Sequence, residues 1–408
     1  MPKHIRTQQC AGDVLKHCRR YDILYKNPSE RHYRKMRKIV IAPDSFKGSI
    51  SSAEAARAIA AGVREFDAAA MTVTIPIADG GEGTLDALTK PGDRINVPAF
   101  NTHGEPRNAE FGYIGKTAVI ESASAVGLGT VDEALRCPEI STTKGVGTLI
   151  LAALDRGFER IMLTVGGTGS NDGGAGMLGA LGTVFYGDNG EISNIRAYDL
   201  KNIRKIDISA LDRRLYRTEF IIACDVNNPL TGTRGATYVY GPQKGADSEM
   251  LRRLEDGIIN YSEKLAAVSR DVSEIPGAGA GGGLPVPLMA LFGARILSGI
   301  DAVLDAVGFD AALEGASLVI TGEGRLDAQS ANGKAIGGVA ARAAARGIPV
   351  AAIAGQLGDG ADTMRARGIY TMYALTDIAP CAEYAIANAA ALLTRLGRQA
   401  ACDFFEKK

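Results

Sequence analysis

The sequence predicts an α/β protein of two domains, in which a doubly wound domain with a parallel sheet is interrupted by a mixed α/β insertion. Apolar, β-branched runs near both ends of the chain alternate with alanine-rich helical segments, a pattern typical of strands joined by crossover helices. From about residue 94, strand-like segments follow one another across short turns and indicate antiparallel hairpins. A chain of 408 residues is also too long for one ordinary core.

The predicted domain limits follow from where this pattern changes. We expect residues 36–92 and 286–408 to form the doubly wound domain, and residues 93–285 to form the mixed α/β insertion. Residues 1–35 carry nine Lys/Arg against three Asp/Glu and lack apolar periodicity. We interpret this segment as a dispensable extension ahead of Met36. The alternatives are a targeting peptide and a basic arm that binds nucleic acid or a membrane.

The composition is that of a soluble globular protein, and the cysteine pattern favours a cytoplasmic enzyme. The chain is 46% hydrophobic and 23% charged, with a formal net charge of zero. No apolar run of about 20 residues predicts a membrane span, and nothing in the charge balance calls for a nucleic-acid partner. The six cysteines show no metal-binding spacing and are typical of free thiols. Beyond residue 35 the only histidine is His103, so general-base catalysis falls to a carboxylate.

The first strand-like run, 37–43, ends in the polar stretch DSFKGS (44–49). The helix behind it opens with a capping box, SSAE (51–54). A loop between a strand and a helix start can bind an anion through backbone N–H groups and the helix dipole, and Lys47 adds a positive charge. The alternative is that Asp44 caps the turn and Lys47 is solvated.

The next strand-like run is followed by the stretch DGGEGT (79–84). Gly80 and Gly81 permit a close approach of the backbone to a ligand. Asp79 and Glu82 supply the oxygen ligands that Mg²⁺ prefers. The alternative is a tight turn whose two acids cap a helix.

The densest glycine loop is GGTGSNDGGAG (166–176), which lies between a predicted strand and a helix. Backbone N–H groups in such a loop can hold a phosphate or a carboxylate, and Asp172 is its one charged residue. The alternative is that the glycines serve helix packing. Two further polar stretches, ACDVNNPL (223–230) and GPQKGA (241–246), follow the next strand.

The segment LVITGEGRLDAQSANGK (318–334) begins as a buried strand and turns abruptly polar. Two cations and two carboxylates lie within a short stretch, at the kind of position where α/β sheets bind ligands. Its Gly333-Lys334 pair lacks the other residues of a P-loop. Residues 277–282 fit the GxGxxG motif of dinucleotide-binding proteins, but Pro276 is unfavourable for the strand that should precede it. The alternative that the protein is a NAD-dependent dehydrogenase is therefore supported by this weak motif alone.

Six motifs in this order resemble the bacterial glycerate kinases of type 1, the glycerate 2-kinases. They are APDSFKGS, PIADGGEGT, GGTGSNDGGAGM, ACDVNNPL, GPQKGA and VITGEGRLD followed by GK. The resemblance runs from Met36 to near the C-terminus. It implies two α/β domains, one of them flavodoxin-like, and transfer of the ATP γ-phosphoryl group to D-glycerate to give 2-phosphoglycerate. The chain departs from the family pattern at Gly169-Ser170-Asn171, at Ser330, and at Pro285 and Pro287.

The resemblance also implies roles for individual residues, with ATP and Mg²⁺ as cofactors. We expect Lys47, Asp172, Arg325 and Asp225 to be catalytic, with Asp172 or Asp225 as the base. We expect Mg²⁺ to be held by Asp79, Glu82, Glu323 and Asp327. Substrate or phosphate is expected to contact Asp44, Ser45, Gly80, Gly81, Gly166, Gly167, Gly173, Gly174, Asn227, Lys244, Gly322 and Lys334.

Two alternatives for the function stay open: a kinase that forms 3-phosphoglycerate, and a non-catalytic sugar-acid binding protein on the same fold. The expected partner is the small-molecule substrate D-glycerate. A homodimer is compatible with the sequence.

Overall fold

The structure is a computed structural model, and it describes residues 37–46, 48–78, 83–89, 91–327 and 335–406. Its first sheet is built from the two ends of the chain and has five parallel strands in the order β14-β13-β12-β1-β2. Numbered within this sheet, the order is 2-1-3-4-5, which is one of the two common doubly wound arrangements. The strands are β1 (Lys38–Pro43), β2 (Met71–Thr74), β12 (Leu318–Leu326), β13 (Val350–Leu357) and β14 (Ile369–Ala374).

Alternate residues of these strands pack into two different apolar layers. Ile39 and Ile41 pack with α1 and α13, whereas Val40 and Ala42 pack with α9 and α11 on the opposite face. This alternation is what a parallel sheet covered on both faces requires. The helices are α1 (Ser52–Phe66), α9 (Gly299–Ala306), α10 (Phe309–Ala312), α11 (Ala335–Ala344), α12 (Ala382–Ala387) and α13 (Ala389–Glu406).

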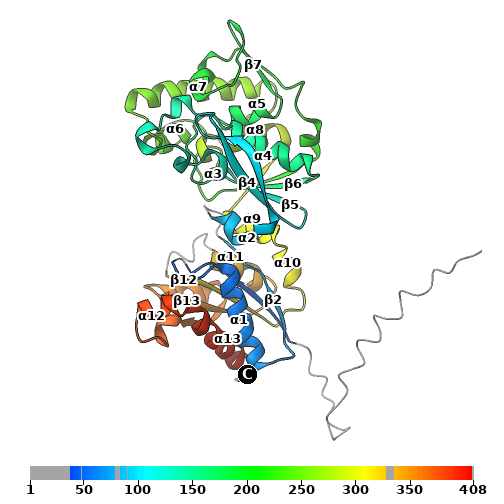
Figure 1. Ribbon diagram of the computed structural model, residues 1–408, viewed down its shortest axis with the longest axis vertical. Helices are drawn as coiled ribbons and strands as arrows, with labels where there is room; N and C mark the ends of the chain where they lie inside the picture. Colours follow the sequence, from blue (N-terminus) through cyan, green and yellow to red (C-terminus); the bar gives the residue numbers. More distant parts are fainter. Residues whose placement is uncertain (1–36, 47, 79–82, 90, 328–334, 407–408) are drawn as a thin grey trace, which may run out of the picture. The chain divides into compact units, whose positions relative to one another are not determined.

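Helices α1 and α13 lie side by side against the sheet (Figure 1). Their close approach depends on glycine: a Cβ on Gly62 would collide with the Thr394 carbonyl, and one on Gly397 would lie 2.6 Å from the Ile59 carbonyl oxygen. The predicted capping box of α1 is confirmed, because the Glu54 N–H donates to Ser51 Oγ and the Ser51 N–H donates to the Glu54 carboxylate.

The second sheet has six strands in the order β11-β10-β6-β5-β4-β3. Strands β3 to β5 form the predicted antiparallel hairpins, and β5, β6, β10 and β11 run parallel. Strand β11 lies in the range predicted for the doubly wound domain and pairs with β10 in this second sheet. The strands are β3 (Arg94–Phe100), β4 (Pro106–Ile114), β5 (Thr117–Glu121), β6 (Arg160–Thr164), β10 (Glu219–Ala223) and β11 (Arg295–Leu297).

A small antiparallel sheet, β8-β7-β9, occupies part of the segment between β6 and β10. Its strands are β7 (Val184–Gly187), β8 (Gly190–Glu191) and β9 (Lys205–Asp207). The remaining helices are α2 (Thr84–Leu88), α3 (Ser122–Val126), α4 (Lys144–Asp155), α5 (Ala175–Ala180), α6 (Ala236–Tyr240), α7 (Ser248–Ala266) and α8 (Pro285–Phe292).

The two prolines that depart from the family pattern lie in the first turn of α8. Pro285 is its first residue, a position where the missing N–H is not needed by the helix. Pro287 packs so close to Gly174 that a Cβ there would lie 2.7 Å from the proline ring. The prolines therefore begin a buried helix that covers the glycine loop.

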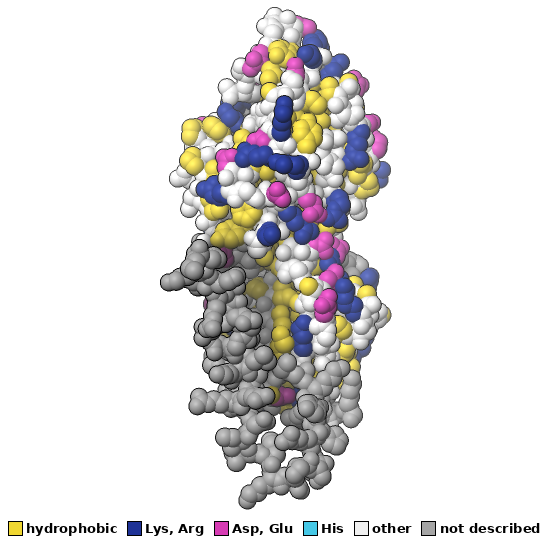
Figure 2. All heavy atoms as spheres, turned by 90° about the vertical axis from the view of Figure 1, so that its right-hand side faces the viewer, with side chains coloured by type: hydrophobic (Ala, Val, Ile, Leu, Met, Phe, Trp, Pro, Cys, Tyr) yellow, Lys and Arg dark blue, Asp and Glu magenta, His cyan; other side chains and the backbone are white. Residues whose placement is uncertain are grey.

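The surface carries both signs of charge. On the face drawn in Figure 2, basic and acidic side chains are intermingled and do not gather into a field of one sign. The cysteines within the described ranges are free thiols, as predicted. Within those same ranges, no helix combines the length and the apolar character needed to cross a membrane.

Candidate functional site

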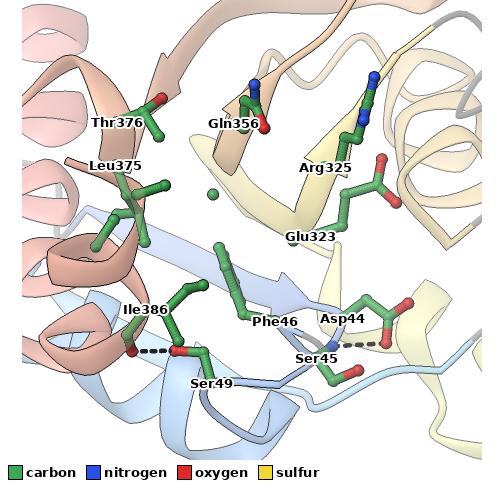
Figure 3. Close-up of a pocket in the computed structure, with 14 residues that line it drawn as sticks. Asp44, Ser45, Phe46, Ser49, Glu323, Arg325, Gln356, Leu375, Thr376 and Ile386 are labelled. Atoms are coloured by element: carbon green, nitrogen blue, oxygen red, sulfur yellow. Dashed lines mark hydrogen bonds between the residues drawn. The ribbon is translucent and has the colours of Figure 1, made fainter.

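A cavity of about 370 Å³ lies at the carboxyl ends of β1, β12 and β13 (Figure 3). This is the edge at which open α/β sheets bind ligands, and the volume falls in the range of small-molecule sites. We call it the first cavity. It is lined by Asp44, Ser45, Phe46, Ser49, Glu323, Gly324, Arg325, Gly355, Gln356, Leu375, Thr376, Ala382, Ala385 and Ile386.

Two carboxylates enter the first cavity from neighbouring strands. Pro43 pairs with Gly322, and the Asp44 N–H donates to the Gly322 carbonyl at 2.8 Å, so Asp44 and Glu323 occupy adjacent positions. The Asp44 carboxylate also accepts the N–H of Ser45 at 2.6 Å. Because the strands are parallel, both acids are delivered at the same level of the sheet.

Glu323 and Arg325 reach the cavity from one strand. The sequence predicted a polar loop here, but β12 continues to Leu326 because Arg325 pairs with Gln356 of β13. Residues two apart on a strand point to the same side, which brings the carboxylate and the guanidinium to one wall. The Arg325 side chain is 64% exposed, so its donors are available to a ligand.

Asp327 lies close to Arg325, with Oδ2 3.5 Å from Nε. This carboxylate was predicted to bind metal, but the structure places it beside a cation. In this arrangement it helps to orient the guanidinium.

Gly322 was predicted to contact substrate, and the structure gives it a different role. It is buried, and a Cβ at this position would collide with the Ile353 carbonyl and lie 3.3 Å from the Phe46 ring. The glycine therefore allows β13 and Phe46 to approach β12, and it shapes the wall of the cavity from behind.

A short turn holds Phe46 in place. The Phe46 N–H donates to the Ile50 carbonyl at 2.9 Å, and the Ser49 hydroxyl donates to the Ile386 carbonyl of α12 at 2.5 Å. These bonds tie the loop after β1 to a helix from the other end of the chain. Sequence reasoning missed Phe46, Gln356, Leu375, Thr376 and Ile386. Gln356 could have been found from its position, because ligands bind at the carboxyl ends of parallel strands and Gln356 lies near the end of β13. We call this the strand-end rule.

A second cavity, of about 290 Å³, lies beside β6 and β10 of the second sheet. Of the predicted residues, Gly166, Gly167, Asp225 and Lys244 line it. Asp225 is exposed and accepts the N–H of Gly299 at 2.8 Å. The other lining residues are Leu128, Val165, Thr168, Ala223, Cys224, Val226, Tyr240, Gln243, Ala280 and Gly281. Asn227 is exposed but is not among the lining residues.

Asp172 does not border either cavity. Its side chain is fully buried and accepts hydrogen bonds from the Thr143 N–H and hydroxyl and from the N–H groups of Gly174 and Gly176. Burial raises the pKa of this carboxyl, and the hydrogen bonds oppose the increase. The geometry gives no support to its predicted role as the base; it supports a role in holding the glycine loop together.

The glycine loop itself is largely a buried scaffold. Gly173 and Gly174 have φ angles of 63° and 79° and pack against Tyr261 and Pro287, where a side chain would collide. The predicted contacts of these two glycines with substrate therefore have no support in the structure. In the loop 166–176, only Gly166 and Gly167 are exposed.

Lys244 contacts the glycine loop through a hydrogen bond to its backbone. It is buried, and its ammonium group donates to the Ser170 carbonyl at 2.5 Å. Burial lowers the pKa of Lys244 to about 8, while the nearby Asp172 carboxylate opposes this shift.

Several predicted residues lie outside the described ranges. These are Lys47, Asp79, Gly80, Gly81, Glu82 and Lys334. Of the four predicted metal ligands, Glu323 and Asp327 are therefore described. Within the described part of the chain, no group of three or more His, Cys, Asp or Glu side chains is arranged to hold a metal ion.

Comparison with known proteins identifies the family. Residues 39–404 match the model of the glycerate kinase family. The chain belongs to the glycerate kinase family. It is 43% identical over 343 residues to a glycerate 2-kinase of Escherichia coli K12, covering 83% of this chain and 90% of that protein. It is 44% identical over 345 residues to a glycerate kinase of Bacillus cereus, with the same two coverages.

The family assignment extends to the fold. A crystal structure of a protein assigned as glycerate kinase 2 from Salmonella typhimurium LT2 is similar with a TM-score of 0.80 and 39% sequence identity. The similarity covers 91% of this chain and 99% of that chain. The mixed α/β architecture with parallel sheets is therefore that of a glycerate kinase.

Proposed function

We propose that this protein is a glycerate kinase that transfers the γ-phosphoryl group of ATP to D-glycerate and forms 2-phosphoglycerate. The observation that carries the proposal is the meeting of Asp44, Glu323 and Arg325 in one strand-end cavity. It occurs in a chain that matches the glycerate kinase family from residue 39 to residue 404.

In phosphoryl transfer, a protein mainly positions the two substrates and neutralises the charge of the phosphate groups. The exposed guanidinium of Arg325 has the planar donor geometry that suits phosphate oxygens in a bidentate contact. Asp327, 3.5 Å from it, supports this orientation. Arg325 is therefore assigned to the transferred phosphoryl group, and the carboxylate of glycerate is its alternative partner.

Asp44 and Glu323 fit a magnesium ion. Magnesium ions in kinase sites are held by one or two carboxylates together with water and phosphate oxygens. The two acids come from adjacent positions of neighbouring strands and so supply such a pair. Bound Mg²⁺ would neutralise phosphate charge at this end of the cavity. Asp79 and Glu82 stay predictions as further ligands.

Asp225 stays the predicted base, because of the two predicted carboxylates it alone borders a cavity; that cavity is the second one, whereas Arg325 lines the first. In the reaction, the hydroxyl oxygen of glycerate forms a bond to the γ-phosphorus, and the bond from that phosphorus to the bridging oxygen breaks. The electron pair leaves with ADP, and the hydroxyl proton passes to a general base, for which Asp225 stays the prediction. The contacts predicted for Ser45, Lys47, Asn227 and Lys334 stay predictions.

We also propose the two-domain description, with a flavodoxin-like domain interrupted by a mixed α/β insertion. The strand order of the first sheet supports it. The pairing of β11 with β10 moves the end of the proposed insertion beyond residue 297.

The test is identification of the product by ³¹P NMR after incubation with D-glycerate and MgATP. We expect the resonance of 2-phosphoglycerate and an equal amount of ADP. A 3-phosphoglycerate resonance would correct the position of transfer. Binding of D-glycerate without any turnover would favour the non-catalytic alternative.

A further inference from the structure

The first cavity has two chemically different halves. One half is apolar and is formed by Phe46, Leu375, Ala385 and Ile386, which come from the loop after β1, the 3-10 turn Leu375–Asp377 and α12. The other half carries Asp44, Glu323 and Arg325. Figure 3 shows the apolar side chains and the charged side chains on different sides of the cavity, with Gln356 between them at one rim.

The apolar half leaves hydrophobic surface uncovered at Ile386, whereas Phe46, Leu375 and Ala385 are already buried. Ile386 is 53% exposed although it lines the cavity, and its carbonyl is held by Ser49. Phe46 lines the same cavity and is fixed by the turn to Ile50. A ligand with a flat apolar surface would cover the Ile386 side chain and gain free energy from its burial.

We propose that the apolar half of the first cavity binds the adenine ring of ATP, with the phosphates directed toward the charged half. This inference rests on the proposed function, in which ATP and D-glycerate are the two substrates. Glycerate is a three-carbon acid whose carbons all carry oxygen, so an apolar wall does not match it. The base of the nucleotide is the one part of either substrate that does.

Gln356 is placed to recognise the base. Its side chain is exposed at the rim, and its amide combines a donor with an acceptor. Adenine presents the N6 amino donor beside the N7 acceptor, and glutamine pairs with this edge in a bidentate manner. At the same edge guanine has the acceptors O6 and N7 and no donor, so the glutamine carbonyl loses its hydrogen bond. Gln356 therefore favours ATP over GTP.

The decisive measurement is the Kd of ADP by isothermal titration calorimetry, together with the KM values for ATP and D-glycerate. We expect Ile386→Ala to weaken ADP binding about fivefold. Ala382→Trp, at an exposed position that lines the cavity, fills it and should weaken ADP binding more than about tenfold. Tyr384→Ala is the matched control, because Tyr384 is 46% exposed on the same helix but does not line the cavity. It should bind ADP like the wild type.

A second readout uses base selectivity. Gln356→Ala should reduce the preference for ATP over GTP in kcat/KM about tenfold. The KM for D-glycerate should stay within about twofold of the wild type in all these variants. Far-UV circular dichroism and thermal melting establish that each variant is folded.

The outcomes separate this inference from the proposed function. If Ile386→Ala and Ala382→Trp are folded and bind ADP like the wild type, the inference is overturned, whether or not glycerate is phosphorylated. A KM for D-glycerate that rises as much as the Kd of ADP would assign the cavity to the acid and also overturn it. Loss of ADP affinity in a protein that fails to phosphorylate glycerate would sustain the nucleotide site and refute the proposed substrate.

Discussion

Replacing Lys244 with methionine tests whether this buried cation is part of the scaffold of the glycine loop. The side chain is 2% exposed, and its ammonium group donates to the Ser170 carbonyl. Burial lowers the pKa of Lys244 from 10.5 to about 8. Methionine has a similar length and carries no charge, so it removes the cost of keeping an ammonium group in the interior.

The lowered pKa sets the sign and the size of the effect. A base whose pKa is lower in the folded protein binds its proton more tightly in the unfolded chain, here by about 3 kcal/mol. Below about pH 8 both states are protonated, and the folded protein carries this full cost. Between about pH 8 and 10.5 only the unfolded chain is protonated, so the cost decreases as the pH rises and the wild type becomes more stable.

Methionine also leaves the Ser170 carbonyl without its donor, which costs about 1 kcal/mol at every pH. We therefore expect Lys244→Met to be more stable than the wild type by about 2 kcal/mol at pH 7 and to lose this advantage by pH 10. The difference between the two pH values isolates the ammonium group, because the effects of packing and of the lost hydrogen bond are the same at both.

The assay is urea denaturation at pH 7 and pH 10, followed by circular dichroism. Lys116→Met is the control, since Lys116 is exposed in the turn between β4 and β5 and its replacement should change the stability little at either pH. A difference between Lys244→Met and the wild type that is the same at pH 7 and pH 10 would refute the reasoning.

Three further substitutions test the site and the packing. Arg325→Lys should lower kcat/KM about 100-fold in a coupled ADP-release assay without changing the unfolding midpoint, because an ammonium group cannot reproduce the bidentate contact; near-wild-type turnover would contradict the assignment. Glu323→Gln should raise the Mg²⁺ concentration needed for half-maximal activity about tenfold, and an unchanged magnesium titration would argue against Glu323 as a ligand. Gly62→Ala should lower the free energy of unfolding by about 2 kcal/mol or more, because its Cβ collides with the Thr394 carbonyl. Gly129→Ala, which meets open space, should cost less than about 1 kcal/mol in the same urea titration.

The sequence predicted the first sheet well where the signals are local. The apolar runs that became β1 and the start of β12 lie where they were expected, and so does the capping box of α1. These features depend on residues within a few positions of one another. The extension of β12 to Leu326 was missed, because it depends on hydrogen bonding to β13, which no local pattern reports.

The glycine loop 166–176 shows why composition alone misassigns a site. A glycine is required both where a ligand approaches the backbone and where another side chain does, and the two cases look alike in sequence. Gly173 and Gly174 are glycines because Tyr261 and Pro287 pack against them, and both partners come from distant segments. Within this loop, only Gly166 and Gly167 at its start are exposed, as the predicted contact with a phosphate or a carboxylate requires.

The strand-end rule located the first cavity, whereas composition misassigned residues of the glycine loop. The rule depends on the topology of the sheet and not on the residue types of one segment. Parallel strands deliver their carboxyl ends to one edge, so the order of strands fixes which loops meet before any side chain is considered. This is why Asp44 and Glu323, far apart in the sequence, could be expected to lie near each other once β1 and the strand at 318 were both called parallel. Gly322 lies next to both acids, and its missing side chain lets β13 and Phe46 close the wall against which a substrate would pack.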